Sequence, residues 1–148
     1  MKRQLRSLYI SSNSVLSRFG LCSVSVKCRL IDSFSLNFYC SYLWCNFNKA
    51  SISKMRVAYN NIYRRILGYN RRDSASLMFA THGIDSFEAR ARKVCYGFRN
   101  RLELSSNAIV LSVLHNASMM HTYIHQHWNQ CCILILVTSD VIYELVRE

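Results

Sequence analysis

The chain contains no proline in its 148 residues, and this constrains its fold more than any other sequence feature. Average usage of about 5% would supply several prolines. Because proline removes a backbone donor and clashes with the preceding turn, a chain without it can form long uninterrupted helices. Hydrophobic residues make up 51% of the chain, which is enough for a buried core. The sequence therefore predicts an all-α fold, a compact bundle of about five to six helices followed by a C-terminal tail.

The clearest helical pattern lies between Ser53 and Gly68. Apolar side chains recur there at spacings of four, three and four residues, at Met55, Tyr59, Ile62 and Ile66. Ser53 is a suitable N-cap, and Gly68 stands where a left-handed C-terminal cap would lie. The pattern predicts a helix with one apolar face and one basic, amide-rich face.

Two helices are predicted after this one. The first begins after Asp73, runs through residues 74–81 and stops at Gly83. The second starts with Asp85 as its N-cap and Glu88 three residues later, a spacing typical of a capping box. Its apolar stripe consists of Phe87, Ala91, Val94, Phe98 and Leu102.

Two more helices are predicted upstream. Leu5, Leu8, Val15 and Phe19 form an apolar series that ends at the Gly20 break. From Ser23 to residue 47 the sequence favours a long, mostly buried helix, although its Phe, Tyr, Val and Cys residues are also common in strands.

Charge is strong and uneven along the chain. The formal net charge is +11 and the pI is near 9.6. Residues 1–48 carry +5, residues 49–101 carry +9 and residues 102–148 carry −3. Such an excess indicates a polyanionic partner, with nucleic acid the commonest and an anionic membrane surface next.

The seven cysteines, an odd number, show no CxxC pair and no regular spacing, which disfavours a secreted disulfide scaffold. Ser and Asn interrupt the first twenty residues, so a signal peptide is also disfavoured. The longest aliphatic run, "CCILILV", has 7 residues, far below the roughly 18 that a spanning helix needs. We expect a cytoplasmic or nuclear protein without a transmembrane helix or membrane partner.

Six pieces of the chain carry a family resemblance. They are "KRQLRSLY", "CSVSVKCRLIDSF", "FYCSYLW", "KMRVAYNNIYRRILG", "RRDSASLMFATHGIDSFEA" and "GFRNRLELSSN". In this order they resemble the region that follows the polymerase core of non-LTR retrotransposon (LINE-like) reverse transcriptases. The resemblance covers about residues 1–115 and implies a helical, thumb-like or linker domain there, followed by a divergent Cys/His-containing tail over residues 116–148.

The resemblance does not imply that this chain is an enzyme. Polymerases of that family use paired carboxylates that hold two metal ions, whereas Asp32, Asp73, Asp85 and Asp140 are never adjacent here. The family's endonuclease belongs to a separate amino-terminal domain. Met1 falls inside what resembles a running helix of the parent protein, which is consistent with a truncated remnant. We expect no catalytic residues and no cofactor.

In the parent protein this segment would hold an RNA or RNA/DNA template-primer by its phosphates. The predicted nucleic-acid-binding residues are Lys54, Arg56, Arg64, Arg65, Arg71, Arg72, Arg90 and Lys93. Tyr59, Tyr63 and Tyr69 would stack on bases if exposed, but the apolar spacing of Tyr59 favours a core position. Three alternatives stay open: a merely solvated basic face, a helical module that binds an acidic protein, and a translated relic without function.

The tail offers a possible metal set. His121 and His125 are four residues apart, and His127, Cys131 and Cys132 follow closely. The spacing fits no standard zinc finger, and the Cys-x-Cys order of the family's terminal motif is absent, so incidental histidines are the favoured interpretation and no metal site is predicted. A weaker hypothesis is that Cys95 is a catalytic thiol nucleophile and His82 is its base. It is disfavoured because cysteine is a common core residue.

Overall fold

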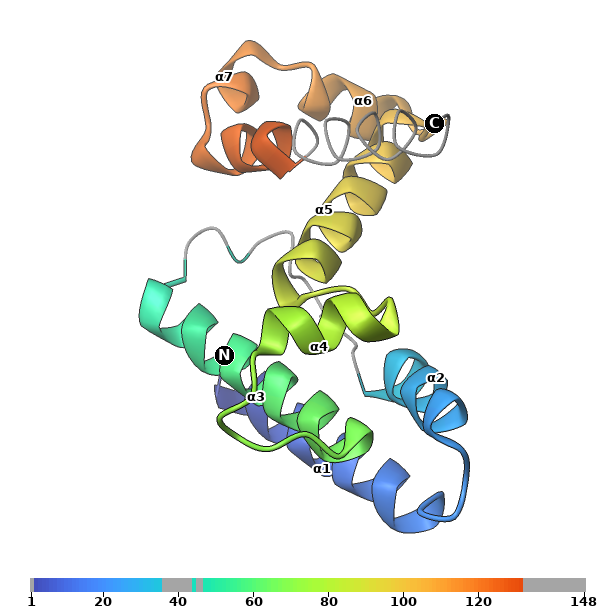
Figure 1. Ribbon diagram of the computed structural model, residues 1–148. Helices are drawn as coiled ribbons and strands as arrows, with labels where there is room; N and C mark the ends of the chain where they lie inside the picture. Colours follow the sequence, from blue (N-terminus) through green and yellow to red (C-terminus); the bar gives the residue numbers. More distant parts are fainter. Residues whose placement is uncertain (1, 36–43, 45–46, 132–148) are drawn as a thin grey trace, which may run out of the picture. The chain divides into compact units, whose positions relative to one another are not determined.

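A computed structural model describes residues 2–35, 44 and 47–131, and all regular secondary structure in these ranges is helical (Figure 1). The predicted all-α class is confirmed, with seven named helices and a further helical segment at 123–131. The named helices are α1 (Lys2–Arg18), α2 (Val24–Phe34), α3 (Lys49–Leu67), α4 (Ala75–His82), α5 (Phe87–Glu103), α6 (Ala108–Leu114) and α7 (Ala117–Met120). None of the described helices is both long and apolar enough to cross a membrane.

The chain divides into two compact units. Unit 1 is Met1–Tyr39 with Phe47–Glu88, and unit 2 is Cys40–Asn46 with Ala89–Glu148. Along the chain, unit 1 ends at Glu88, whereas the resemblance predicted a domain boundary after residue 115. The boundary at residue 115 stays a prediction.

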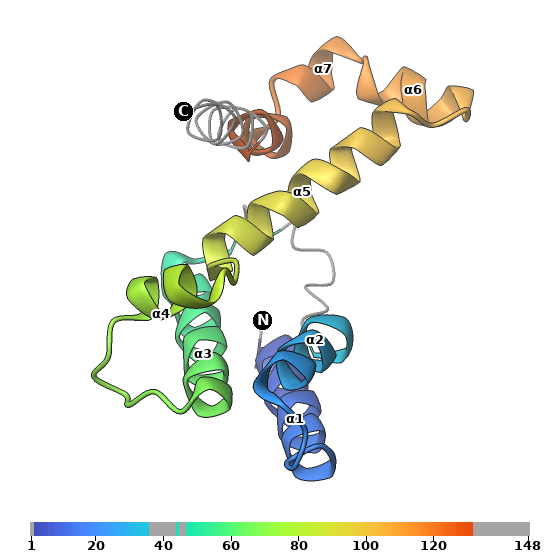
Figure 2. The same cartoon turned by 45° about the vertical axis from the view of Figure 1, so that its right-hand side comes forward.

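Unit 1 is organised around α3, which contacts α1, α2 and α4. Figure 2 shows α1 and α2 side by side in this unit. The buried face of α3 consists of Met55, Ala58, Tyr59, Ile62, Tyr63 and Ile66. All four members of the predicted stripe are among them, because a 3.6-residue period returns these positions to one side of the helix.

The ends of α3 and α4 follow from their capping residues. Gly68 and Gly83 have φ of 75° and 61°, a left-handed conformation that favours glycine at helix C-termini. The predicted N-terminus of α3 was wrong: the helix begins at Lys49, where the Asn48 side chain accepts from the Ala50 N–H at 2.8 Å. An asparagine one turn before Ser53 satisfies the free backbone donors, so the helix starts there.

The helix predicted from Ser23 is much shorter than expected. Ser23 is its N-cap, but α2 ends at Phe34, and Ile31 is the only buried residue within it. Residues 36–43, 45 and 46 of the predicted helix lie outside the described residues. The expectation of a mostly buried helix was wrong for the described part, where Val24, Val26 and Phe34 are exposed.

Unit 2 has a small core of its own. Its buried members are Cys95, Leu114, Trp128 and Cys131, and the half-buried Phe98, Leu102 and Ile124 pack against them. The ring of Phe98 meets the Trp128 indole edge-on at 5.5 Å between centroids. This core joins α5 and α6 to the helical segment 123–131, so residues far apart in the sequence meet inside unit 2.

Helix α5 begins at Phe87, two residues after the predicted N-cap Asp85, whose capping role stays a prediction. The Asp85 carbonyl accepts a hydrogen bond from the Tyr59 hydroxyl at 2.6 Å. The apolar stripe predicted for α5 is buried at Phe87 and half-buried at Ala91, Val94, Phe98 and Leu102.

Candidate nucleic-acid interface

Unit 1 carries most of the positive charge. It contains 13 Lys and Arg residues against 4 Asp and Glu residues. Thirteen cations face only four carboxylates in this unit, and of these Asp32 accepts from the Tyr63 hydroxyl, Asp73 from the Asn70 N–H, and Glu88 from Arg56. Most of the cations therefore have no nearby carboxylate to neutralise them.

Arg56 is the exception among the predicted basic residues of α3. Its guanidinium donates to the Glu88 carboxylate at 3.2 Å, and both side chains are about half exposed, at 50% and 45%. Beside them lies a shallow hollow of about 220 Å³, lined by Lys49, Ile52, Ser53, Arg56 and Glu88. The Glu88 carboxylate offsets the charge of Arg56, so Lys49 is the other cation that lines this hollow.

Arg64 holds the turn that follows α3. Its guanidinium donates to the Asp73 carbonyl at 2.8 Å and to the Asn61 amide oxygen at 3.2 Å, while its Nε is buried without a hydrogen-bond partner. The Asp73 carboxylate closes the same turn by accepting from the Asn70 N–H at 2.6 Å. Arg64 was predicted to bind phosphate, and its geometry indicates that it positions the segment carrying Arg71 and Arg72.

Arg65 is exposed and oriented by a neutral partner. It donates to the Asn13 amide oxygen of α1 at 2.8 Å. Because an amide carries no net charge, this bond fixes the guanidinium without cancelling its charge. Lys54 lies eleven residues earlier on α3, which places it within about 20° of the same side of the helix and about 16 Å away along its axis.

Lys54, Arg71 and Arg72 are exposed, and among the described residues none of them has a hydrogen-bond or ion-pair partner. With Arg65 they form the set we call the α3 basic patch: Lys54, Arg65, Arg71 and Arg72. Two of its members come from one side of α3 and two from the turn after Gly68.

The two remaining predicted residues belong to unit 2. Arg90 is half-buried and Lys93 is exposed on α5, and both interact with other residues. They belong to a different unit from the α3 basic patch, and their role in nucleic-acid binding stays a prediction.

The tyrosines of α3 are not available for base stacking. Tyr59 and Tyr63 are fully buried, with ring centroids 4.9 Å apart and Phe79 against both. Burial, with the neighbouring Tyr59 and Asp32, raises the pKa of Tyr63 far above its usual value. Tyr69 is half-buried, and its ring meets His82 edge-on. The core position favoured for Tyr59 by its spacing is confirmed.

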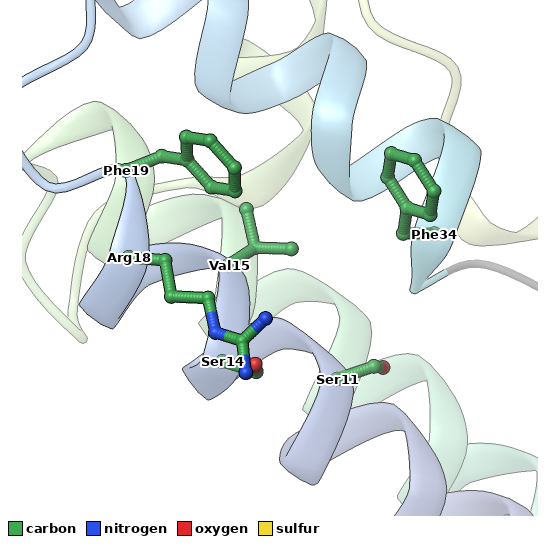
Figure 3. Close-up of a pocket in the computed structure, with 6 residues that line it drawn as sticks. All are labelled: Ser11, Ser14, Val15, Arg18, Phe19 and Phe34. Atoms are coloured by element: carbon green, nitrogen blue, oxygen red, sulfur yellow. The ribbon is translucent and has the colours of Figure 1, made fainter.

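A second hollow in unit 1 lies between α1 and α2, with a volume of about 320 Å³ (Figure 3). Figure 3 shows Val15 between the rings of Phe19 and Phe34. The complete lining is Ser11, Ser14, Val15, Arg18, Phe19 and Phe34. The Ser11 hydroxyl donates to backbone carbonyls of its own helix, and Arg18 is the one charged residue of the lining.

Sulfur and imidazole groups converge inside unit 2. Cys95, His127 and Cys131 place one ligand atom each within 4.8 Å of the others, and they are the one group of three or more potential metal ligands in the described part of the chain. A hydrogen bond from Cys95 lowers the pKa of the Cys131 thiol, and the charge of Arg92 lowers it further, against the opposing effect of burial. Burial lowers the pKa of His127, which favours the neutral imidazole.

Only His127 and Cys131 of this group belong to the possible metal set that the tail sequence offers. His125 is buried and pairs with Asn129 at 3.3 Å, His121 is exposed, and Cys132 lies outside the described residues. Cys95 was missed as a ligand because it stands 32 residues before His127. The four-residue spacing of His127 and Cys131 was the one signal in the sequence that could have indicated the site.

A third hollow, also in unit 2, has a volume of about 530 Å³. It is lined by Arg99, Glu103, Leu114, His115, His125 and Asn129. Its one guanidinium is already paired with Glu103 at 2.7 Å and contacts the Asn129 amide. The hollow therefore has no unpaired cation to attract an anion.

Comparison with protein-family models, with curated proteins and with solved structures finds no match for this chain. The resemblance to LINE-like reverse transcriptases rests on the six sequence pieces and stays a prediction.

Proposed function

We propose that this chain binds the sugar-phosphate backbone of nucleic acid through the α3 basic patch. The observation that carries the proposal is the combination of exposed, unneutralised cations with a turn that is held in place by Arg64. Arg64 fixes the backbone that carries Arg71 and Arg72, and Asn13 orients the Arg65 guanidinium, so these parts of the patch lose less freedom when they meet phosphates. The patch is therefore suited to an extended polyanion.

The dimensions of the patch fit a nucleic-acid backbone. Lys54 and Arg65 are about 16 Å apart along α3, a span of about five base pairs at 3.4 Å per step. Arg71 and Arg72 extend the patch beyond the C-terminal end of the helix. If the patch neutralises four phosphates, a plot of the logarithm of the binding constant against the logarithm of the salt concentration should have a slope of roughly −3 to −4. We call this slope the log-log salt slope.

The chemistry predicts binding with little dependence on base sequence. Lysine and arginine contacts to phosphate carry no base information, and the buried rings of Tyr59 and Tyr63 cannot stack on bases. We propose a template-primer duplex as the partner, in keeping with a non-catalytic C-terminal portion of a retroelement reverse transcriptase. The support for this origin is the set of resembling pieces across about residues 1–115.

A length series of RNA/DNA duplexes tests the proposal. Affinity should rise with length until the patch is covered, and the slope against salt should fall in the range given above. A slope near zero, or equal affinity for all lengths, contradicts backbone binding. The origin is tested separately by sequencing the genomic DNA upstream, where a polymerase reading frame is expected.

The alternative function, a helical module that binds an acidic protein, has one observation in its favour. Phe34 is 64% exposed beside the hollow between α1 and α2, where Arg18 adds a cation to apolar walls. An acidic peptide with an apolar anchor would suit this surface. If Phe34→Ser weakens binding of such a peptide and leaves nucleic-acid binding unchanged, the result would favour this alternative.

A further inference from the structure

Three side chains in unit 2 meet although they come from distant parts of the sequence. Cys95 lies on α5, and His127 and Cys131 lie one turn apart in the helical segment 123–131. The Cys131 sulfur is 3.8 Å from the His127 Nε2, and all three ligand atoms lie within 4.8 Å of one another. Two sulfurs and one imidazole nitrogen therefore face a common point.

We propose that Cys95, His127 and Cys131 bind a zinc ion. Zinc prefers a tetrahedral set of thiolate and imidazole ligands, with bonds of about 2.3 Å to sulfur and about 2.0 Å to nitrogen. Such bonds separate neighbouring ligand atoms by about 3.5 to 3.8 Å. The His127 to Cys131 distance already matches, and the remaining pairs need to close by no more than about 1.3 Å.

The charge balance of the site favours a divalent ion. Each thiol releases its proton to solvent when its sulfur binds the metal. Two thiolates, one neutral imidazole and one Zn²⁺ then have no net charge. A neutral group suits the apolar surroundings, where Trp128, Leu114 and Phe98 pack around the sulfurs and limit access of water.

Zinc held by these three residues would have one coordination position left. Cys95 and Cys131 are buried, and His127 is half-buried. Three protein ligands leave the fourth tetrahedral position for water or a small anion. Cys132 lies outside the described residues and is not part of the proposal.

A metal at this position would tie two helices together. Cys95 and Cys131 are 36 residues apart, and the only described elements that link their helices in sequence are the short α6 and α7. Because the unfolded chain does not present these ligands together, binding favours the folded unit by mass action. Zinc should therefore raise the thermal midpoint of the protein, and a chelator should lower it.

The test uses the full chain purified under reducing conditions. Wild-type protein should bind about one Zn²⁺ per chain, and Co²⁺ in its place should give the intense visible bands of tetrahedral coordination with thiolate charge-transfer absorption. Cys95→Ser and Cys131→Ser should each weaken metal binding at least about tenfold. Cys22→Ser and Cys28→Ser are matched controls, since both are free thiols in unit 1, and they should bind as wild type does.

His127→Cys distinguishes a lost ligand from a lost fold. It replaces one zinc ligand with another, so Co²⁺ should still bind, with thiolate charge-transfer absorption raised by about half because three sulfurs replace two. Circular dichroism checks that each variant is as helical as wild type. The proposal is overturned by weak octahedral Co²⁺ spectra, by unchanged binding in both Cys95→Ser and Cys131→Ser, or by a Cys95–Cys131 disulfide in the reduced preparation.

Discussion

Units 1 and 2 are both helical, but they differ in charge and in what their interiors contain. Unit 1 carries 13 basic and 4 acidic residues, and unit 2 carries 6 and 4. The interior of unit 1 is aromatic, with Tyr59, Tyr63 and Phe79 in mutual contact. The interior of unit 2 contains two thiols beside an imidazole and an indole.

The difference shows where each unit can interact with a ligand. In unit 1 the buried hydroxyls of Tyr59 and Tyr63 donate to the Asp85 carbonyl and the Asp32 carboxylate, so these two core hydroxyls have partners within the protein. Its unneutralised groups lie on the surface, in the α3 basic patch. In unit 2 the sulfurs of Cys95 and Cys131 and an imidazole nitrogen of His127 lie within 4.8 Å of one another, and thiolate and imidazole are ligands that zinc prefers. Unit 1 is therefore suited to bind an anion at its surface, and unit 2 is suited to bind a metal ion within its core.

The largest effect is expected for the aromatic core of unit 1. Tyr59→Ala removes a fully buried ring that contacts Tyr63, Phe79 and Phe87, and should lower the free energy of unfolding by about 3 to 5 kcal/mol. Tyr59→Phe keeps the ring and loses the hydroxyl that donates to the Asp85 carbonyl, at a cost of about 1 kcal/mol. Urea unfolding measures both. Equal losses for the two variants would show that the hydroxyl, and not the packed ring, stabilises this core.

A smaller effect is expected for the arginine that holds the turn after α3. Arg64→Ala removes the bonds to the Asp73 carbonyl and the Asn61 amide and should cost about 1 to 3 kcal/mol. Arg56→Ala is the matched control in the same helix. Its ion pair with Glu88 is about half exposed, so its loss should cost less than about 0.5 kcal/mol. Equal unfolding midpoints for the two variants in urea would contradict a positioning role for Arg64.

The smallest effects come from three glycines, and they should differ in sign between the units. Gly68→Ala and Gly83→Ala place a side chain at φ of 75° and 61° in unit 1 and should each destabilise by about 1 to 2 kcal/mol. Gly97 lies inside α5 in unit 2, where an added Cβ meets nothing within 4 Å. Gly97→Ala should therefore stabilise by about 0.5 to 1 kcal/mol. Thermal melting of the three variants checks the signs, and destabilisation by Gly97→Ala would indicate that this helix position is more crowded than described.

Local patterns predicted much of unit 1. The stripe of Met55, Tyr59, Ile62 and Ile66 and the cap at Gly68 depend on residues within one helix, so a sequence pattern contains the needed information. The helix start was missed because Asn48 and Ser53 are both good caps, and pattern alone does not decide between them. The length of α2 was missed because its apolar residues suggested more burial than the fold provides.

Tertiary contacts explain what the sequence could not predict. Arg64 belongs to the basic face of α3 by its position, but its partner Asp73 lies beyond the turn, and only the folded chain brings them together. The ligand group in unit 2 has the same property. The spacing of His127 and Cys131 is visible in the sequence, whereas Cys95 joins them from a separate helix.

The most direct test of the central claim compares two charge-matched variants in binding to a template-primer duplex across salt concentrations. The first changes the α3 basic patch, Lys54, Arg65, Arg71 and Arg72, to Gln. The control changes four exposed cations of α1 and α2 to Gln: Lys2, Arg3, Arg6 and Arg29. Both variants lose the same net charge, so any difference between them reports the place of binding.

The patch variant should lose roughly 3 to 4 from the magnitude of the log-log salt slope, because four phosphate contacts disappear. The control should lose less than about 1, since its residues would act only through long-range attraction that salt screens. Equal slopes in the two variants, or a larger loss in the control, would contradict binding at the end of α3.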